Sequence, residues 1–519
     1  MIGHYQAMRV FAMDGLRLTE EQAAPCASNA DVIKVEAGAG TGKTTMLRGI
    51  AQSKSSLRHL YVAFNKSIQL EAASKFPGNV TCKTAHSLAY GAVGRDYGNV
   101  PNKLQGDIKP FHVTRQLQRS LQPLPQSAHN LYGGRVIETL KNYLVSGDGQ
   151  MVPKHISIGD APVERSHFEP RQILHDAMQI WTEMQDLRSE VPMLHDGYLK
   201  LYQVANRRLP YDSILFDEAQ DTNPVTQAIV DQQQAKKTYV GDRNQAIYGF
   251  RGASNAMEQI PADETFYLTG SFRFGEEVAD VANKILDLKG DVVHLRGLGA
   301  PSKIRALGAG EGHAFLSRGN SALFDRAVNA LLKNEPFSFV GDIKGYRFDQ
   351  ILDVYNLSIK GQVKDPFIRS FSSFDELLEY AEMINDREVK SRCKVVTAYG
   401  RDIPSLIERI ERAALSPIVS GSGLVVPDNR IVLTTVHKSK GLEFPNVRLA
   451  GDFMEFIDSD TNQLLDMAKA DNSIIEEINL AYVAVTRVQQ SLHLNDQLEA
   501  YLEYIAELAA NRSSRPSMA

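Results

Sequence analysis

Residues 31–52 read DVIKVEAGAGTGKTTMLRGIAQ, and this stretch decides the fold. It begins with a short run rich in β-branched residues, continues with the glycine-rich loop AGAGTGKT at 37–44, and becomes a helical pattern from Thr45. A strand, a glycine-rich loop and a helix in this order are the context of a phosphate-binding loop. In such a loop the backbone N–H groups cradle phosphates, a lysine adds positive charge and a hydroxyl binds Mg²⁺. We therefore expect Lys43 and Thr44 to belong to a site for ATP and Mg²⁺.

A second motif supports this site. The run SILFDEAQD at 213–221 carries Asp217 and Glu218 to the end of an apolar strand. There Asp217 would hold Mg²⁺, and Glu218 would orient and deprotonate the attacking water. An acidic pair at a strand end is weak evidence for such a site by itself, but it is strong evidence in a chain that also has a phosphate loop. The loop departs from the usual pattern once, since Ala37 stands where glycine is typical, and the alternative is a flexible turn without a ligand.

Strands and helices continue to alternate along the chain, which predicts an α/β fold with parallel sheets. Two stretches, 91–200 and 346–425, are mostly helical and are interpreted as insertions into the α/β units. The other predicted strands are HLYVAF, SILFDEA, KTYVGD, ETFYLT, HAFLSR, FSFVGD, RIVLTTVH and VRLAGD.

Composition limits the class of protein. The 519 residues are 43% hydrophobic and 23% charged, as in ordinary globular chains. The net charge of −5 and the pI near 6.3 argue mildly against a nucleic-acid binder, although a local basic groove is enough for phosphate contacts. No run of about 18 apolar residues and no signal-peptide pattern is found, so no membrane partner is expected. Cys26, Cys82 and Cys393 form no CxxC pair, which favours a cytoplasmic protein without zinc or disulfides.

Nine motifs follow one another between about residue 18 and residue 495: LTEEQ, KVEAGAGTGKTT, YVAFNKSIQLEA, CKTAHSLAY, FDEAQD, VGDRNQAIYGFRGA, TGSFRF, LTTVHKSKGLEF and EINLAYVAVTRV. Together they resemble the motifs of the UvrD/Rep branch of superfamily 1 helicases. The resemblance implies two RecA-like P-loop NTPase domains with parallel sheets, each carrying a mostly helical insertion. It also implies a motor that hydrolyses ATP and moves along single-stranded DNA.

The same resemblance assigns residues to the nucleotide. Gln22 would read the adenine, Phe272 would stack on it, and Glu443 would lie near the ribose. Thr44 and Asp217 would bind the metal ion. The phosphates would be held by Ala37, Gly38, Ala39, Gly40, Thr41, Gly42, Lys43, Thr44 and Thr45.

Catalytic roles also follow from the motifs. Gln245 would sense the γ-phosphate, and Arg273 and Arg487 would reach it from the second α/β unit. Arginines that arrive only on closure would couple hydrolysis to domain movement. The full catalytic set is Lys43, Asp217, Glu218, Gln245, Arg273 and Arg487.

Nucleic-acid contacts are expected from several motifs. Phe64 and Phe250 would stack on bases without reading sequence, and the alternative for each is core packing. His86 and His437 would contact the strand, and the alternative for each is a loop cap. The full set is Phe64, Asn65, Thr84, His86, Tyr248, Phe250, Arg251, His437, Lys440 and Tyr482.

The expected organisation follows from the positions of these motifs. The second insertion is short, which makes translocation a safer expectation than strong duplex unwinding. The domains are expected at 1–90 with 201–268 (first RecA-like, ATP-binding), 91–200 (helical insertion), 269–345 with 426–505 (second RecA-like), 346–425 (small accessory insertion) and 506–519 (disordered tail).

Two stretches refine the branch. VPMLHDGYLKLYQ at 191–203 and DPFIRSFSSFDELLEYAE at 365–382 are similar to F-box DNA helicases and their bacterial and phage relatives. Because the sequence begins just ahead of Gln22, we expect neither an F-box nor a ubiquitin-ligase role. His195 and Asp196 are expected to position the insertion on the core or to touch nucleic acid, and the alternative is a purely structural role.

Polarity and biological role rest on the resemblance alone. Lys440 stands where the opposite-polarity RecD-like group carries glutamine, which favours 3′→5′ movement. Three roles stay open: a DNA helicase in repair or recombination, a translocase that strips proteins from single strands, and a DNA-stimulated ATPase acting as a sensor or effector in a complex such as a phage-defence system. The expected partners are single-stranded DNA, its junctions with duplex, and possible partner proteins such as a nuclease or a repair or defence factor.

Overall fold

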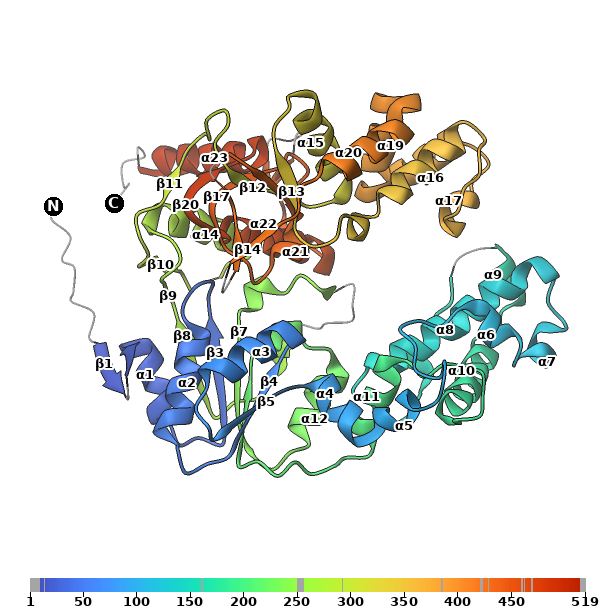
Figure 1. The fold of residues 1–519 in the computed structure, drawn as a ribbon, viewed down its shortest axis with the longest axis horizontal. Helices are drawn as coiled ribbons and strands as arrows, with labels where there is room; N and C mark the ends of the chain where they lie inside the picture. Colours follow the sequence, from blue (N-terminus) through green and yellow to red (C-terminus); the bar gives the residue numbers. More distant parts are fainter. Residues whose placement is uncertain are drawn as a thin grey trace, which may run out of the picture. The chain divides into compact units, whose positions relative to one another are not determined.

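The computed structural model of the chain describes residues 10–513 except 14, 160–161, 250–255, 292, 384–385, 421–422, 428, 459–460, 462 and 468–469. The chain divides into two compact units. The first comprises Met1–Ala37 and Gly42–Leu268, and the second comprises Gly38–Thr41 and Thr269–Ala519. Each unit combines a parallel sheet with helices, as Figure 1 shows, so the expected α/β class is confirmed. Among the described helices, none has both the length and the apolar character needed to span a bilayer.

The first unit is built on a six-stranded sheet in the order β5-β4-β6-β7-β3-β8, and every neighbouring pair is parallel. Alternate residues of β4 belong to two different hydrophobic clusters. Tyr61 and Ala63 belong to one cluster, and Leu60 and Val62 belong to the other. Both faces of the sheet are therefore covered, which is usual for parallel strands. The strands are β3 (Val32–Ala37), β4 (His59–Ala63), β5 (Val80–Thr84), β6 (Ser213–Phe216), β7 (Lys236–Gly241) and β8 (Glu264–Leu268).

Helices and a small hairpin complete the α/β part of this unit. The antiparallel hairpin of β1 and β2 precedes α1. The bounds are β1 (Val10–Met13), β2 (Leu16–Thr19), α1 (Glu20–Ala27), α2 (Lys43–Ser53), α3 (Lys66–Lys75), α12 (Pro224–Asp231) and α13 (Ala256–Gln259).

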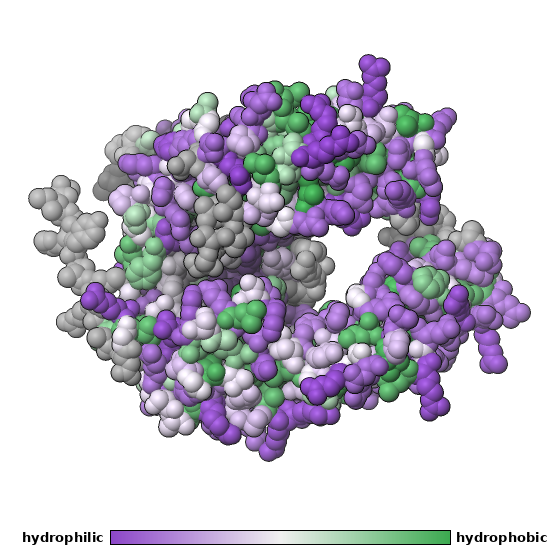
Figure 2. Space-filling view, in the orientation of Figure 1, coloured by the Kyte–Doolittle hydropathy of each residue, from purple (hydrophilic) through white to green (hydrophobic). Residues whose placement is uncertain are grey.

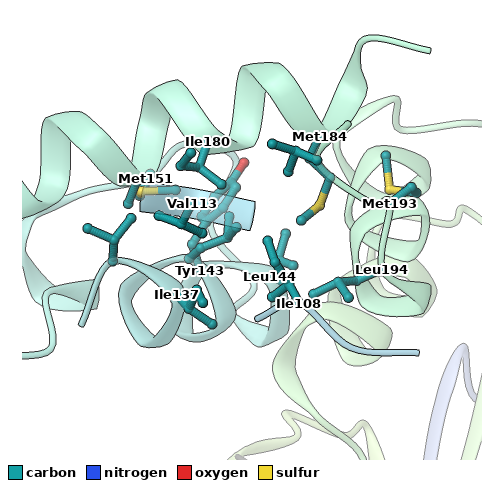
Figure 3. Packing of buried hydrophobic residues seen from close by; sticks show 14 of the residues in the cluster. Ile108, Val113, Ile137, Tyr143, Leu144, Met151, Ile180, Met184, Met193 and Leu194 are labelled. Carbon is teal, nitrogen blue, oxygen red and sulfur yellow. The ribbon is translucent and has the colours of Figure 1, made fainter. Parts of the chain in front are cut away.

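A helical insertion lies between β5 and β6 and has its own core. Figure 3 shows Val113, Ile137, Tyr143, Ile180 and Met184 packed between its helices, and each is almost completely buried. The outer face seen in Figure 2 is mostly hydrophilic, as expected once the apolar side chains are enclosed. Its α-helices are α4 (Ala85–Ala89), α5 (Arg95–Gly98), α6 (Pro110–Thr114), α7 (Gln118–Leu121), α8 (His129–Val145), α9 (Pro162–His167), α10 (Pro170–Gln185) and α11 (His195–Val204).

The second unit repeats the plan with a six-stranded parallel sheet in the order β11-β20-β17-β12-β16-β13. All the strands named from the sequence are present in the two sheets, so those predictions are confirmed. The strands are β11 (Lys303–Ile304), β12 (His313–Ser317), β13 (Phe337–Phe339), β16 (Ile431–Thr435), β17 (Phe444–Leu449) and β20 (Val488–His493).

The helices of the second unit include two departures from expectation. A short antiparallel hairpin, β14 with β15, interrupts the helical series before β16. The tail predicted to be disordered from residue 506 is helical as far as Ser513, because EAYLEYIAELAA is rich in strong helix formers. The bounds are α14 (Glu276–Asp287), α15 (Asn320–Leu332), α16 (Phe348–Ser358), α17 (Pro366–Arg369), α18 (Phe374–Met383), α19 (Arg387–Tyr399), α20 (Ile403–Ala413), β14 (Ile418–Ser420), β15 (Gly423–Val425), α21 (Val436–Ser439), α22 (Asn472–Val485) and α23 (Asp496–Ser513).

Candidate functional site

The glycine-rich loop connects β3 to α2 with a backbone that favours glycine. Gly40 and Gly42 have φ values of +73° and +78°, in the left-handed region that residues with a Cβ rarely adopt. Gly42 is the N-cap of α2 and offers no side chain to the first turn. The N–H groups of that turn are therefore not capped by the residue before them. A helix start of this kind is suited to bind an anion such as phosphate.

Lys43 and Glu218 form an ion pair in the first unit. The Lys43 ammonium lies 3.0 Å from the Glu218 carboxylate, and both side chains are largely buried. Although burial lowers the pKa of Lys43, the charges of Glu218, Asp217 and Asp242 outweigh it and raise the pKa. The lysine is therefore held protonated, in the charged form that binds phosphate.

Asp217 lies at the end of β6, beside this ion pair. Tyr61 donates its hydroxyl to Asp217 Oδ2 at 2.6 Å, and the Glu218 N–H donates to Asp217 Oδ1 at 2.9 Å. Burial and the charge of Glu218 raise the pKa of the Asp217 carboxyl to about 6, against the lowering effect of Lys43. Glu218 itself has φ +52°, which is uncommon outside glycine and typical of residues held for a function. Tyr61 was not anticipated, because no local pattern links a β4 residue to the end of β6.

A hydrogen-bonded chain leads from Glu218 to Gln245. Gln220 donates its amide to Glu218 Oε2 at 2.6 Å, and its carbonyl oxygen accepts from the Asp242 N–H at 3.1 Å. Gln245 in turn donates to Asp242 Oδ2 at 2.8 Å. Gln220 is completely buried and was missed from the sequence, although it stands within FDEAQD. The structure thus joins two predicted catalytic residues through a third that was not predicted.

Gln22 caps the start of helix α1. Its side-chain oxygen accepts from the Thr19 N–H at 3.1 Å, and Thr19 Oγ1 accepts from the Gln22 N–H at 3.2 Å. This is a capping box at the start of α1. The contact of Gln22 with adenine stays a prediction.

The two predicted arginines of the second unit, Arg273 and Arg487, lie close together, since Arg273 bonds to the residue before Arg487. Arg273 pairs with Glu443 at 2.7 Å and donates to the Thr486 carbonyl at 2.7 Å. Arg487 is buried, and its Nε donates to the Val483 carbonyl at 3.1 Å. Burial acts to raise the pKa of Glu443, but the positive charge of Arg273 outweighs it and lowers the pKa. The carboxylate is therefore ionised where it fixes the arginine.

Two other predicted residues of this unit, Phe272 and Tyr482, lie near the two arginines in the sequence. Phe272 follows β9 (Gly270–Ser271), is 47% exposed, and donates its N–H to the Gly40 carbonyl at 2.9 Å. Tyr482 is buried, and its hydroxyl accepts from the Ala39 N–H at 3.3 Å. Gly38–Thr41 group with this unit, so both bonds are internal to it. The contacts of Phe272 with adenine and of Tyr482 with nucleic acid stay predictions.

A cavity of about 460 Å³ in the first unit collects residues from the early motifs and from the helical insertion. The Phe64 and Tyr248 rings are nearly parallel there, with centroids 6.0 Å apart and an angle of 15° between planes. His86 lies 3.3 Å from Asp196, which belongs to the first turn of α11. The lining is Val62, Ala63, Phe64, Ala85, His86, Val145, Asp196, Phe216, Asp221, Thr222, Asn223, Thr226 and Tyr248.

The remaining predicted nucleic-acid residues fall into three groups. Asn65 and Thr84 are the N-caps of α3 and α4, so both hold helix starts. His437 belongs to α21 and Lys440 follows it. Phe250 and Arg251 lie outside the described residues.

Comparison with known proteins gives a consistent picture. Residues 358–497 match the model of the UvrD-like helicase C-terminal domain, and residues 20–251 match a model described as an AAA domain. The chain is 31% identical to F-box DNA helicase 1 of Gallus gallus, over 92% of this chain and 48% of the relative. It is 31% identical to F-box DNA helicase protein 1 of Schizosaccharomyces pombe, over 93% of this chain and 58% of the relative.

More distant similarities complete the comparison. ATP-dependent DNA helicase PcrA of Leuconostoc citreum is 22% identical over 60% of this chain and 57% of the relative. The chain spans about half the length of the curated relatives it matches. "The structure of PRRSV helicase" is similar at a TM-score of 0.24 with 12% identity, over 56% of this chain and 36% of that chain, which is too distant to bear on the fold.

Proposed function

Because the chain belongs to the UvrD/Rep-like superfamily 1 helicases, a family of ATP-dependent DNA helicases, we propose that it hydrolyses ATP to move along single-stranded DNA. Its proposed substrates are single strands and their junctions with duplex. The proposed direction is 3′→5′, in line with Lys440 in the motif LTTVHKSKGLEF. Translocation is the core activity, and duplex unwinding follows from it at a junction.

One observation carries the proposal. The hydrogen-bonded chain from Glu218 through Gln220 and Asp242 ends at Gln245, three residues before Tyr248. Glu218 stands beside Lys43 of the phosphate loop, whereas Tyr248 stacks with Phe64 at the cavity. We propose that a change at the γ-phosphate passes along these bonds to the segment that carries Tyr248. Packed, hydrogen-bonded groups of this kind carry coupling between sites, here proposed between hydrolysis and strand contact.

The proposed chemistry follows from the geometry of the first unit. The N–H groups of the loop and the Lys43 ammonium bind the β- and γ-phosphates. Glu218, held by Gln220, orients the attacking water and accepts its proton. The ion pair of Lys43 with Glu218 implies that an arriving γ-phosphate competes for the lysine and leaves the carboxylate to the water.

Mg²⁺ fits this site as a partner of the nucleotide. In the described part of the chain, no group of three or more His, Cys, Asp or Glu side chains gathers to form a metal cage. An ion held by one carboxylate, one hydroxyl and the phosphates needs no such cage. Asp217 and Thr44 would hold it, and when bound it neutralises charge on the phosphates.

Arg273 and Arg487 are proposed to stabilise the charge of the transferring phosphoryl group. Glu443 and the Thr486 carbonyl fix Arg273, which limits the reorganisation that the charged group needs. Such arginines commonly account for several orders of magnitude in the rate of phosphoryl transfer.

Two measurements test the proposal. ATP turnover is measured with and without single-stranded DNA, and many-fold stimulation is expected. Duplexes with a 3′ or a 5′ single-stranded tail are then compared, and unwinding from the 3′ tail is expected. Equal turnover with and without DNA would overturn the motor function, and unwinding from the 5′ tail alone would reverse the direction.

A further inference from the structure

The cavity beside Phe64 and Tyr248 has the charge of a base site rather than of a phosphate site. Asp196 and Asp221 contribute two carboxylates, and among the described residues that line it there is neither lysine nor arginine. Among the described lining residues, a phosphate entering here would meet two carboxylates and no lysine or arginine, which is unfavourable in a partly enclosed space. A neutral base carries no such penalty.

The aromatic pair gives a base a surface on which to stack. Phe64 is 40% exposed although it is apolar, and its ring is almost parallel to the half-buried ring of Tyr248. Stacking on such rings is tolerant of sequence, because every base has a π face. Stacking strength alone gives only modest preferences among bases, and polar groups of the cavity can add a further one.

Asp196 is placed to supply this preference. It lies in the first turn of the ten-residue helix α11, where the helix dipole favours a carboxylate. Its Oδ1 lies 3.3 Å from His86 Nε2, which fixes the orientation of the side chain. The side chain is 46% exposed, so it is accessible to a ligand in the cavity.

We propose that Asp196 reads the base held in this cavity by accepting a hydrogen bond from an exocyclic amine. This inference rests on the proposed single-strand binding. Cytosine and adenine offer such an amine, whereas thymine presents a carbonyl oxygen at the corresponding position. A carboxylate facing that oxygen has no proton to share and is repelled. The strand contact should therefore favour amine-bearing bases over thymine, and His86 acts as a positioning residue for the reading carboxylate.

The test compares oligo(dC) with oligo(dT) of equal length, by binding and by stimulation of ATP turnover. The wild-type protein should bind oligo(dC) about ten- to a hundredfold more tightly, the range expected for one hydrogen bond to a charged group. Asp196→Asn, whose amide can donate as well as accept, should bring the ratio close to one. Asp96→Asn removes the same charge from an exposed site of the helical insertion and should leave the ratio as in the wild type.

A second comparison needs no variant. Oligonucleotides of 2-pyrimidinone deoxynucleotide, which is cytosine without its exocyclic amine, should bind the wild-type protein as weakly as oligo(dT). Equal binding of oligo(dC) and oligo(dT), or a preference that survives Asp196→Asn, would overturn base reading. An equal gain on both oligonucleotides in Asp196→Asn would show that the carboxylate only repels the backbone, and would overturn it too. Absence of any stimulation by DNA would instead reject the proposed motor function.

Discussion

Gln220 holds Glu218 through a hydrogen bond of 2.6 Å between its amide nitrogen and the carboxylate, and its carbonyl oxygen accepts from the Asp242 N–H. The motifs FDEAQD and VGDRNQAIYGFRGA are therefore tied by one buried side chain, which bonds to a residue 22 positions away. Buried networks of this kind are worth more than their separate bonds, and a partly satisfied one is costly.

The first prediction concerns this bridge. Gln220→Ala should lower the stimulation of ATP turnover by single-stranded DNA by about ten- to a hundredfold, because loss of a hydrogen bond to a charged group costs about 1.5–3 kcal/mol. Turnover without DNA should fall less, because Glu218 loses one partner but keeps its ion pair with Lys43. The ratio of stimulated to unstimulated turnover is the measurement. Gln227→Ala, which removes a bond to Asp231 on α12, is the matched control, and an equal effect of both variants would contradict the prediction.

The second prediction concerns the water-activating carboxylate. Glu218→Gln should lower ATP turnover by about 10²–10⁴, the usual contribution of a general base. The neutral amide also removes the charge that faces Lys43 at 3.0 Å, so ATP should bind at least as tightly as in the wild type. DNA affinity in the presence of ATP should rise, because the ATP-bound state persists. Equilibrium binding of a fluorescent ATP analogue and of labelled DNA checks both effects, and wild-type turnover in this variant would refute the assigned role.

The third prediction concerns the aromatic pair. Tyr248→Ala and Phe64→Ala should each weaken binding to single-stranded DNA by about 1–3 kcal/mol, the range for loss of one stacked base. ATP affinity without DNA should change little, because neither ring belongs to the phosphate loop. Tyr267→Ala, an exposed aromatic residue on β8, is the control. Core packing of Phe64 would give a different result, namely a lower melting temperature with unchanged DNA affinity per folded molecule.

Particular residues show what could be predicted from the sequence. The strands and the phosphate loop were predictable because their signals are local: a short apolar run, glycines at left-handed positions, and Lys43 at a helix start. Tyr61 and Gln220 were not, because their partners Asp217 and Asp242 directly follow strands β6 and β7, which only the folded sheet brings close to them. The helix-capping roles of Asn65 and Thr84 were not predicted for a different reason. Asn65 and Thr84 match strand-contact motifs, yet both also cap helices, and a motif does not separate the two tasks.

The last prediction uses a buried lysine of the helical insertion. Lys200 on α11 donates to the carbonyls of Ser146 and Asp148, and its ammonium lies 4.4 Å from the Tyr143 ring centroid. It joins α11 to the segment that follows α8. Burial lowers the pKa of Lys200 to about 8, below the value of about 10.4 for an unfolded chain.

The sign of the pH dependence follows from proton binding. Between pH 8 and about 10.4 the unfolded chain binds more protons at this site than the folded chain, so the lysine's contribution to the free energy of unfolding rises with pH. The unfolding free energy of the wild type minus that of Lys200→Met should therefore rise by about 2 kcal/mol from pH 7 to pH 9.5. Trp181 is the single tryptophan and contacts Tyr143 at 5.9 Å between centroids, so its fluorescence reports unfolding of this insertion. Urea titrations at the two pH values give the comparison. A difference that does not rise would mean that the pKa of Lys200 is not lowered in the folded protein.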